Sequence, residues 1–329
     1  MIEKNNQHKL TFKELFINAY KDSSFPSFII LILLIIINVS LQHNFFSYTN
    51  VKSNFLTFTP LILASIAQAI IIISGSVDLS IGASMSLFTV ITASIMTDSN
   101  VIPVLILGFI AVFIVSGFLN GIIIGKFNIS PLLATYGTSA LILGIAMVIL
   151  PNAGGYVPKF FYRFYQADIL KILPASIFIL IIVMIIWFGI SKTVTYRYIY
   201  AIGSNREGAY ASGINVPNVR IVTHLIASFF IAVAGLCMLM ATATGDYRSG
   251  LPFSLNSIAA VVIGGISLSG GKGNVWGAVV GALVLGLLNN IIFFANISSI
   301  YQIFAKGMII VLSLAIAAVP HIIKEKSGI

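Results

Sequence analysis

The sequence contains few charged residues, a single cysteine and no polar segment long enough to fold as a soluble domain. Charged residues make up 8% of the 329 positions and hydrophobic residues 58%, and the mean hydropathy is +1.05. These values exclude a soluble globular protein. Cys237 lies within an apolar run and has no second cysteine with which to form an internal disulfide, so the cysteine content gives no information about the redox compartment.

The sequence also lacks the residue groupings that carry catalysis, metal binding or nucleotide binding. No metal-ligand spacing, pair of carboxylates, Cys/His cluster or Ser/His/Asp arrangement stands out. The run GGISLSGGKGN, which begins at Gly264, is not a phosphate-binding loop, because its spacing is wrong and Gly273 stands where a Ser or Thr would hold magnesium. We therefore expect no catalytic residue, no metal site and no cofactor in this chain. The four scattered histidines are His8, His43, His224 and His321.

Apolar runs that can cross a bilayer, which takes about 20 residues, recur along almost the whole chain. They predict an all-α integral membrane protein with about ten hydrophobic segments. The short run Ser257–Leu268 is expected to be a broken or re-entrant segment. The other predicted spans are Phe25–Leu41, Thr57–Ser74, Ala83–Met96, Pro103–Ile124, Pro131–Leu150, Leu173–Ile190, Ile221–Ala241, Val275–Phe294 and Ile300–Val319.

The spans divide the chain into a cytoplasmic N-terminal segment (1–24), a single polytopic transmembrane domain (25–319) and a cytoplasmic tail (320–329). The first 24 residues are polar and basic, and the apolar run that follows them has no clear small-residue cleavage site. This pattern favours an uncleaved first span over a signal peptide.

The net charge of +9 follows the predicted topology and does not indicate binding to nucleic acid. If the N-terminus is cytoplasmic and Ser257–Leu268 crosses the membrane, most basic residues fall on the cytoplasmic side, as the positive-inside rule requires. Lys306 falls within the last span, where it either snorkels to the interface or pairs inside the bundle. Those expected inside are Lys4, Lys9, Lys13, Lys21, Lys126, Lys192, Arg197, Arg206, Arg220, Lys272, Lys324 and Lys326, and those expected outside are Lys52, Lys159, Arg163, Lys171 and Arg248.

The polar stretch SNREGAYASG, Ser204–Gly213, separates two long apolar spans and has its own helix boundary signals. Ser204 with Glu207 predicts a capping box, and Gly213 followed by Ile214 predicts a C-terminal stop. A short, capped helix rich in small residues on the cytoplasmic side is suited to docking into a groove of a soluble partner. An ordinary connecting turn is the alternative.

Two glycine-rich elements resemble each other. GSVDLSIG (Gly75–Gly82) and GGISLSGG (Gly264–Gly271) share one pattern, and GFLNGII from Gly117 is echoed by GLLNNII from Gly286. The repeated order predicts an internal duplication, which is common in transporters. Both elements are expected to break a helix at membrane depth, where such breaks line a pathway or are buried; close helix packing through glycine is the alternative. The candidate pathway residues are Gly75, Asp78, Ser80, Gly82, Gly264, Gly265, Ser269 and Gly271.

Asp78 is an ionisable residue flanked by apolar residues in the first broken segment. A carboxylate at membrane depth is costly, and this one is expected to cap the following helix by accepting backbone N–H groups. Direct contact with a substrate and proton handling are the alternatives.

These residues together resemble the membrane permease subunits of ribose-type sugar importers of the ABC transporter class. GSVDLSIG resembles the family's Gly, Asp, Leu, Ser signature, and Tyr200–Val216 resembles its cytoplasmic coupling region. The most specific match is Ser257–Asn290, and the similarity continues through Tyr301, Gln302 and Lys306. Within the coupling region Gly208 stands where the family has alanine. The ATPase-coupling candidates are Ser204, Glu207, Gly208, Ala209, Gly213 and Ile214.

The resemblance implies a multi-pass protein of the bacterial inner membrane that works with three kinds of partner. These are an ABC ATPase that binds ATP and magnesium, an extracytoplasmic sugar-binding protein, and a second permease copy, identical or similar. Lys159, Arg163 and Arg248, in predicted outer loops, are candidates for contact with the binding protein or are simply solvated loop charges.

Other functions remain open at this stage. An ion-coupled secondary transporter would also have broken helices and a duplication. A permease for nucleosides or branched-chain amino acids is a close alternative, and a channel-like protein or membrane enzyme is a more distant one. The sugar itself is not specified by these residues.

Overall fold

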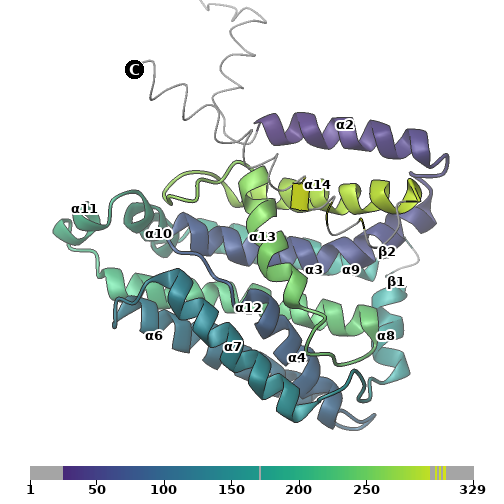
Figure 1. Ribbon diagram of the computed structural model, residues 1–329, viewed down its shortest axis with the longest axis horizontal. Coiled ribbons are helices and arrows are strands. Elements are labelled where there is room, and N and C mark those ends of the chain that lie inside the picture. The colour runs from purple at the N-terminus through teal and green to yellow at the C-terminus, as the bar shows by residue number, and fades with distance from the viewer. Residues whose placement is uncertain (1–24, 170–171, 297–300, 302–303, 305–306, 309–329) are drawn as a thin grey trace, which may run out of the picture.

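The computed structural model describes residues 25–169, 172–296, 301, 304, 307 and 308, and these are mostly helical (Figure 1). The helices are α2 (Phe25–Leu41), α3 (Tyr48–Ile73), α4 (Ile81–Ile95), α5 (Val101–Val112), the π-helix η1 (Phe113–Leu119), α6 (Asn120–Gly125), α7 (Pro131–Ile149), α8 (Lys159–Gln166), α9 (Ala175–Ser191), α10 (Val194–Ser204), α11 (Arg206–Ala211), α12 (Val216–Thr242), α13 (Leu251–Ile263) and α14 (Val275–Phe294). Strands β1 (Asp168–Ile169) and β2 (Leu173–Pro174) form a small antiparallel pair.

The all-α membrane architecture is confirmed, but about ten spanning segments are not. Five helical segments in the described part are long and apolar enough to cross a membrane, or six if α9 and α10, bent by 75° at their junction, count as one. α2, α4 and α13 are shorter apolar helices. The predicted run Ser257–Leu268 corresponds to α13, which begins and ends several residues earlier. The predicted span Ile300–Val319 lies outside the described residues except at positions 301, 304, 307 and 308.

α3 and α12 form the centre of the bundle. Residues 58–73 of α3 are all buried, and α12 packs along them with Phe230, Ile231 and Ala234 buried in its own middle. Polar side chains inside this core bond to their own helix: the Ser65 hydroxyl, for example, donates to the Leu61 carbonyl at 2.7 Å. Such local bonds make buried serines and threonines tolerable where no water is available.

One long span contains an internal π-helix. α5, η1 and α6 follow one another without a break, and η1 lies against α12, where the position of Gly117 allows close approach to Ser228. π-helical turns inside α-helices are rare and each accommodates extra residues in the helical ladder.

The loops and short elements between the long helices lie at the two ends of the bundle (Figure 1). α10 and α11 lie at one end, and α8 with β1 and β2 lies at the other. α13 runs across the direction of its neighbours α3 and α14. α13 therefore connects the loop after α12 with the loop before α14 by crossing the bundle, whereas its neighbours run along it.

Candidate functional site

Helix α11 begins one residue later than the capping-box pattern predicts, and that prediction is wrong. The N-cap is Asn205, whose Oδ1 accepts the backbone N–H of Gly208 at 2.9 Å. The Ser204 hydroxyl instead donates to the carbonyls of Tyr200 and Ala201, and so belongs to the end of α10. Asn is as good an N-cap as Ser, so the choice between these neighbours depends on where α10 ends.

The C-terminal end of α11 agrees with its prediction. Gly213 has φ +81°, its N–H donates to the Tyr210 carbonyl at 2.9 Å, and the N–H of Ile214 donates to the Ala209 carbonyl at 3.1 Å. This pair of bonds is a Schellman motif, in which glycine takes the left-handed position at no steric cost. Ala209 is buried, while Glu207 and Tyr210 are exposed, so α11 presents a free outer face.

The first glycine-rich element forms the loop between α3 and α4, and it buries Asp78 completely. Oδ1 of Asp78 accepts both the backbone N–H and the hydroxyl of Ser80 at 2.6 Å. The N-cap position of α4 is Ser80, so Asp78 supports the start of the helix from two residues upstream and satisfies one backbone N–H group. Asp78 was expected to cap α4; it is not the N-cap residue, but it accepts the N–H of the residue that is.

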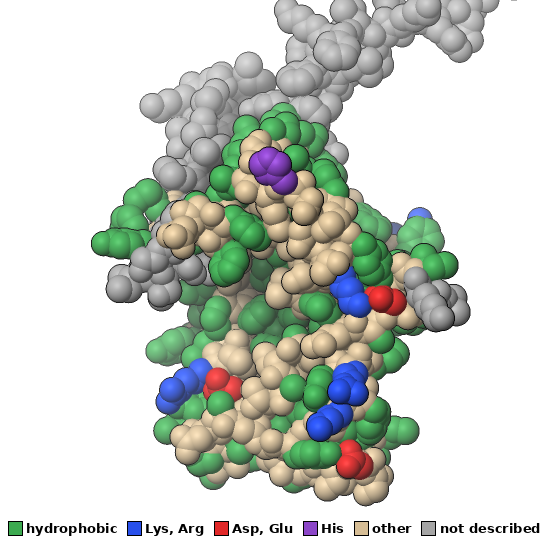
Figure 2. Space-filling view, turned by 90° about the vertical axis from the view of Figure 1, so that its right-hand side faces the viewer, with side chains coloured by type: hydrophobic (Ala, Val, Ile, Leu, Met, Phe, Trp, Pro, Cys, Tyr) green, Lys and Arg blue, Asp and Glu red, His purple; other side chains and the backbone are tan. Residues whose placement is uncertain are grey.

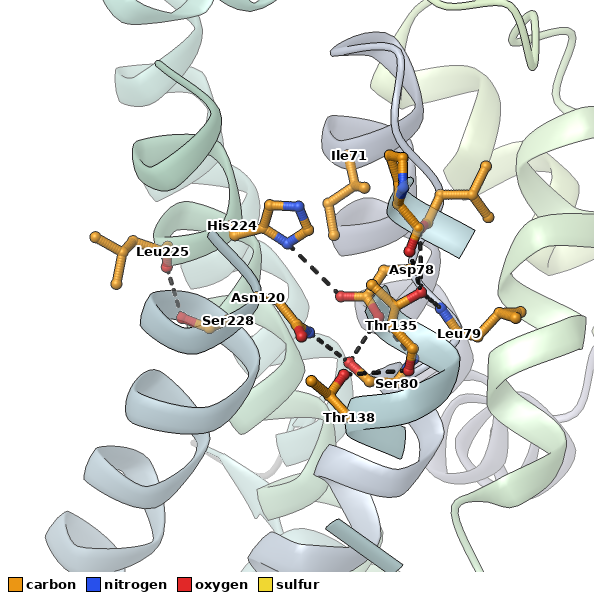
Figure 3. Close-up of polar contacts among 12 residues, drawn as sticks. Ile71, Asp78, Leu79, Ser80, Asn120, Thr135, Thr138, His224, Leu225 and Ser228 are labelled. Carbon is orange, nitrogen blue, oxygen red and sulfur yellow. Dashed lines mark hydrogen bonds and ion pairs between the residues drawn. The ribbon is translucent and has the colours of Figure 1, made fainter. Parts of the chain in front are cut away.

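Side chains of α6, α7 and α12 lie around the Asp78 loop (Figure 3). Asn120 of α6 donates to the Ser80 hydroxyl at 2.9 Å, and Thr135 of α7 accepts the Leu79 N–H at 3.0 Å. The side-chain amide of Gln68 in α3 lies against the Asp78 backbone; with its nitrogen turned toward the Asp78 carbonyl (3.1 Å) and its oxygen toward the Asp78 N–H (3.3 Å), it satisfies both groups. These bonds tie the loop to the helices around it.

His224 of α12 completes this cluster, and its place there could not be predicted from the sequence, in which only its position near the start of a span stands out. Its Nδ1 lies 3.7 Å from Oδ2 of Asp78, and both residues are buried. Among the residues that the structure describes, neither imidazole nitrogen has a hydrogen-bond partner, and neither does Oδ2 of Asp78. The histidine thus faces a carboxylate oxygen whose bonding capacity is unused.

The second glycine-rich element forms the loop after α13 and repeats the backbone geometry of the first. Gly75 and Gly265 have φ of +80° and +82°, and each lies in a Schellman motif at the end of its helix. The N–H of Gly271 donates to the Ile73 carbonyl at 2.9 Å, so the two elements meet. Among the other candidates, Gly82 begins α4, Gly264 ends α13, and Ser269 is exposed.

The three basic residues proposed for the outer face lie at the end of the bundle opposite α11. Lys159 and Arg163 belong to α8, and Arg248 lies in the loop after α12, stacked on Tyr247. The loops after α7 and α12 are joined by reciprocal backbone bonds between Gly154 and Gly245, at 2.8 and 2.9 Å. Figure 2 shows this end, where basic and acidic side chains are scattered rather than gathered into one charged patch.

The residues that carry charge elsewhere on this face are partly paired. Lys52 forms an ion pair with Asp168 at 2.7 Å. Lys171 and Lys306 lie outside the described residues.

Within the described part of the chain, no three His, Cys, Asp or Glu side chains come close enough together to hold a metal ion.

Comparison with known proteins identifies the family. The family described as the branched-chain amino acid transport system / permease component matches residues 50–314. A ribose import permease protein of Haemophilus influenzae is 33% identical over 297 residues, covering 87% of this chain and 90% of the relative. A D-allose transport system permease protein of Escherichia coli strain K12 is 30% identical over 296 residues, covering 89% and 90%.

A galactose/methyl galactoside import permease protein of Haemophilus influenzae is 29% identical over 319 residues, covering 91% of this chain and 94% of the relative. No solved structure matches. The family match covers most of the chain and includes the Asp78 loop, helix α11 and the loop after α13. The chain therefore belongs to the branched-chain amino acid transport system / permease component family, and with the relatives named here the predicted resemblance to sugar-import permeases is confirmed.

Proposed function

We propose that this protein is the transmembrane permease subunit of an ATP-driven importer for a monosaccharide. The observation that carries the proposal is the similarity over almost the full chain to permeases named for ribose, D-allose and galactose. The sugars named by these relatives favour a sugar over the amino acids in the family description. The chain offers no nucleotide-binding loop of its own, so ATP and magnesium would bind to a partner ATPase.

Helix α11 is the proposed contact with that ATPase. It is capped at both ends, and its outward side chains include Glu207 and Tyr210, the latter 74% exposed. An exposed large aromatic side chain beside a charged one is typical of a docking surface. A capped helix keeps its shape when it is pushed, which suits it to transmit the closure of an ATPase as a rigid body.

The rest of the proposed arrangement follows from this orientation. α11 and both termini would be cytoplasmic, and Lys159, Arg163 and Arg248 would face an extracytoplasmic binding protein, with the whole chain in the bacterial inner membrane. A second copy or a similar permease would complete the path between the two subunits. The shared backbone geometry at Gly75 and Gly265 supports an internal duplication of the glycine-rich elements.

The test is co-purification of the tagged permease with the ATPase encoded beside its gene. Glu207→Arg combined with Tyr210→Ala changes only exposed side chains of α11, and we expect the ATPase to be lost from the purified complex. The matched control is Arg163→Glu, an equally drastic charge reversal at the opposite end, which should leave the ATPase bound and weaken stimulation by the loaded binding protein.

The competing function is ion-coupled uptake. If no ATPase associates with the wild-type protein, and vesicles take up sugar in response to an ion gradient without ATP, the proposal fails and a secondary transporter replaces it.

A further inference from the structure

The end of α10 touches both glycine-rich loops through backbone atoms. A Cβ atom at Gly203 would overlap the Ile73 carbonyl oxygen and would lie 2.7 Å from the Gly271 nitrogen. A Cβ atom at Gly270 would lie 2.8 Å from the Gly203 carbonyl oxygen. We call the contact of Ile73, Gly203, Gly270 and Gly271 the glycine junction. Of these residues, Gly203 lies just before α11 in the sequence, because Asn205 is the N-cap of that helix.

The other end of α13 is tied to α4 by a reciprocal pair of hydrogen bonds. The N–H of Gly82 donates to the Ser254 hydroxyl at 3.0 Å, and the N–H of Gly250 donates to the Ser86 hydroxyl at 2.9 Å. Gly82 lies in the first turn of α4 and Gly250 is the N-cap of α13, and each serine lies about one turn after the glycine of its own helix. We call these four residues the serine clasp. The two helix starts can approach so closely because neither Gly82 nor Gly250 has a side chain. A Cβ atom at either position would overlap the carbonyl oxygen of the other.

α13 itself is built as a stiff connection between these two contacts. It contains no charged residue, and its 13 residues extend about 20 Å at 1.5 Å per residue. It packs on α14 at backbone distance, since a Cβ atom at Gly281 would overlap the Ala260 carbonyl oxygen. Helix pairs with small residues at the contact approach closely, so we expect α13 and α14 to move together as one stiff unit. A displacement at one end of α13 therefore reaches the other end.

We propose that α13 is the lever that carries displacement of α11 into the membrane core, and that Ser86 and Ser254 are the positioning residues that transfer it to α4. This inference rests on the proposed function, since it assumes that an ATPase moves α11. A push on α11 moves the end of α10, the glycine junction passes it to the loop after α13, and the serine clasp passes it to the start of α4 beside the Asp78 loop. A single docking helix thus acts on both glycine-rich elements.

The first test removes the clasp without changing the packing. Ser86→Ala with Ser254→Ala removes both acceptors and also the bond that the Ser254 hydroxyl donates to the Leu79 carbonyl at 2.9 Å. We expect the complex to assemble and hydrolyse ATP while sugar uptake per ATP falls roughly tenfold, as expected for the loss of these hydrogen bonds. The matched control is Ser84→Ala, because the Ser84 hydroxyl is buried in the same turn of α4 and has no hydrogen-bond partner in the described part of the chain. Unchanged uptake per ATP in the double variant would overturn the inference.

The second test does not depend on that variant. Spin labels at positions 211 and 269, both exposed, report whether α11 and the loop after α13 move together, and labels at 211 and 126 report movement against α6. The background is Cys237→Ala, which removes the single native cysteine. We expect the 211–269 distance to stay constant between the nucleotide-free complex and one trapped with ATP, while the 211–126 distance changes.

A change between positions 211 and 269 as large as that between 211 and 126 would overturn the lever, and so would no change in either pair. Failure of the proposed function and failure of the lever can be told apart. Loss of the proposed function appears as a wild-type protein that binds no ATPase, whereas failure of the lever appears in a complex that assembles and transports.

Discussion

The carboxylate of Asp78 and the imidazole of His224 face each other inside the bundle, with 3.7 Å between Oδ2 and Nδ1. The other carboxylate oxygen is fully engaged by Ser80. Asp78 therefore joins the start of α4 to the face of α12, and its two oxygens have different tasks. Oδ1, which accepts from Ser80, shapes the loop. Oδ2, which faces His224, can accept a hydrogen bond from a donor.

This difference predicts how Asp78 responds to substitution. Asp78→Asn keeps one carbonyl oxygen to accept the Ser80 N–H, so transport should persist, whereas Asp78→Ala loses it and should cost about 1–2 kcal/mol of stability. Melting temperature and sugar uptake of both variants are the measurements. Equal loss of transport in both variants, with the melting temperature of Asp78→Asn unchanged, would show that the negative charge itself is used.

The cap of α11 predicts a contrast between two adjacent residues. Asn205→Ala should destabilise α11 by about 1 kcal/mol and weaken ATPase binding, because the Gly208 N–H loses its acceptor. Ser204→Ala should leave α11 intact, because the Ser204 hydroxyl bonds only to carbonyls of α10. ATPase retention on the purified permease compares the two. A larger effect from Ser204→Ala would restore the capping-box interpretation.

The glycine junction predicts a steric effect at Gly203. Gly203→Ala should destabilise the protein by about 1–3 kcal/mol, since the added carbon has no space beside the Ile73 carbonyl. Gly189→Ala is the control, because Gly189 also lies within a helix, α9, and a Cβ atom there meets nothing within 4 Å. Thermal unfolding in detergent should separate them, with the control neutral or slightly more stable.

The ion pair between Lys52 and Asp168 predicts a dependence on acid. Hydrogen bonding from Lys52, together with that from Tyr48, lowers the pKa of Asp168 below its ordinary value. The pair then stabilises the fold above the ordinary carboxyl pKa and loses this effect as the pH falls through the lowered pKa. Melting temperatures of wild type and Asp168→Asn should differ at neutral pH and converge in acid; a difference that persists at the lowest pH would contradict this assignment.

Several local features could be predicted from the sequence because short-range chemistry decides them. Gly213 followed by Ile214 marked the end of α11, and the Gly75–Gly82 element marked a break between helices. The capping prediction was wrong by one residue, since Ser204 and Asn205 are both suitable N-caps and only the length of α10 decides between them. α10 itself was missed, because it is short, rich in tyrosine and separated from α9 by a sharp bend.

The tertiary relationships could not be predicted in this way. Apolar runs along the chain do not encode which helix faces which, so His224 gave no signal that it lies beside Asp78. Ser86 and Ser254 are two serines among many in apolar segments, and only their reciprocal bonds to Gly250 and Gly82 distinguish them. The contact of Gly203 with two loops more than 60 residues away in the sequence belongs to the same class.

The π-helix η1 sets the rotational phase of the span that contains it. One residue inserted into a regular α-helix would turn every later residue by about 100° around the axis. A π-helical turn is wider and takes up the extra residue, so Asn120 keeps the orientation in which it donates to the Ser80 hydroxyl at 2.9 Å. Removing one residue from 113–119 would therefore return the span to regular α-helix while leaving α6 attached to the Asp78 loop.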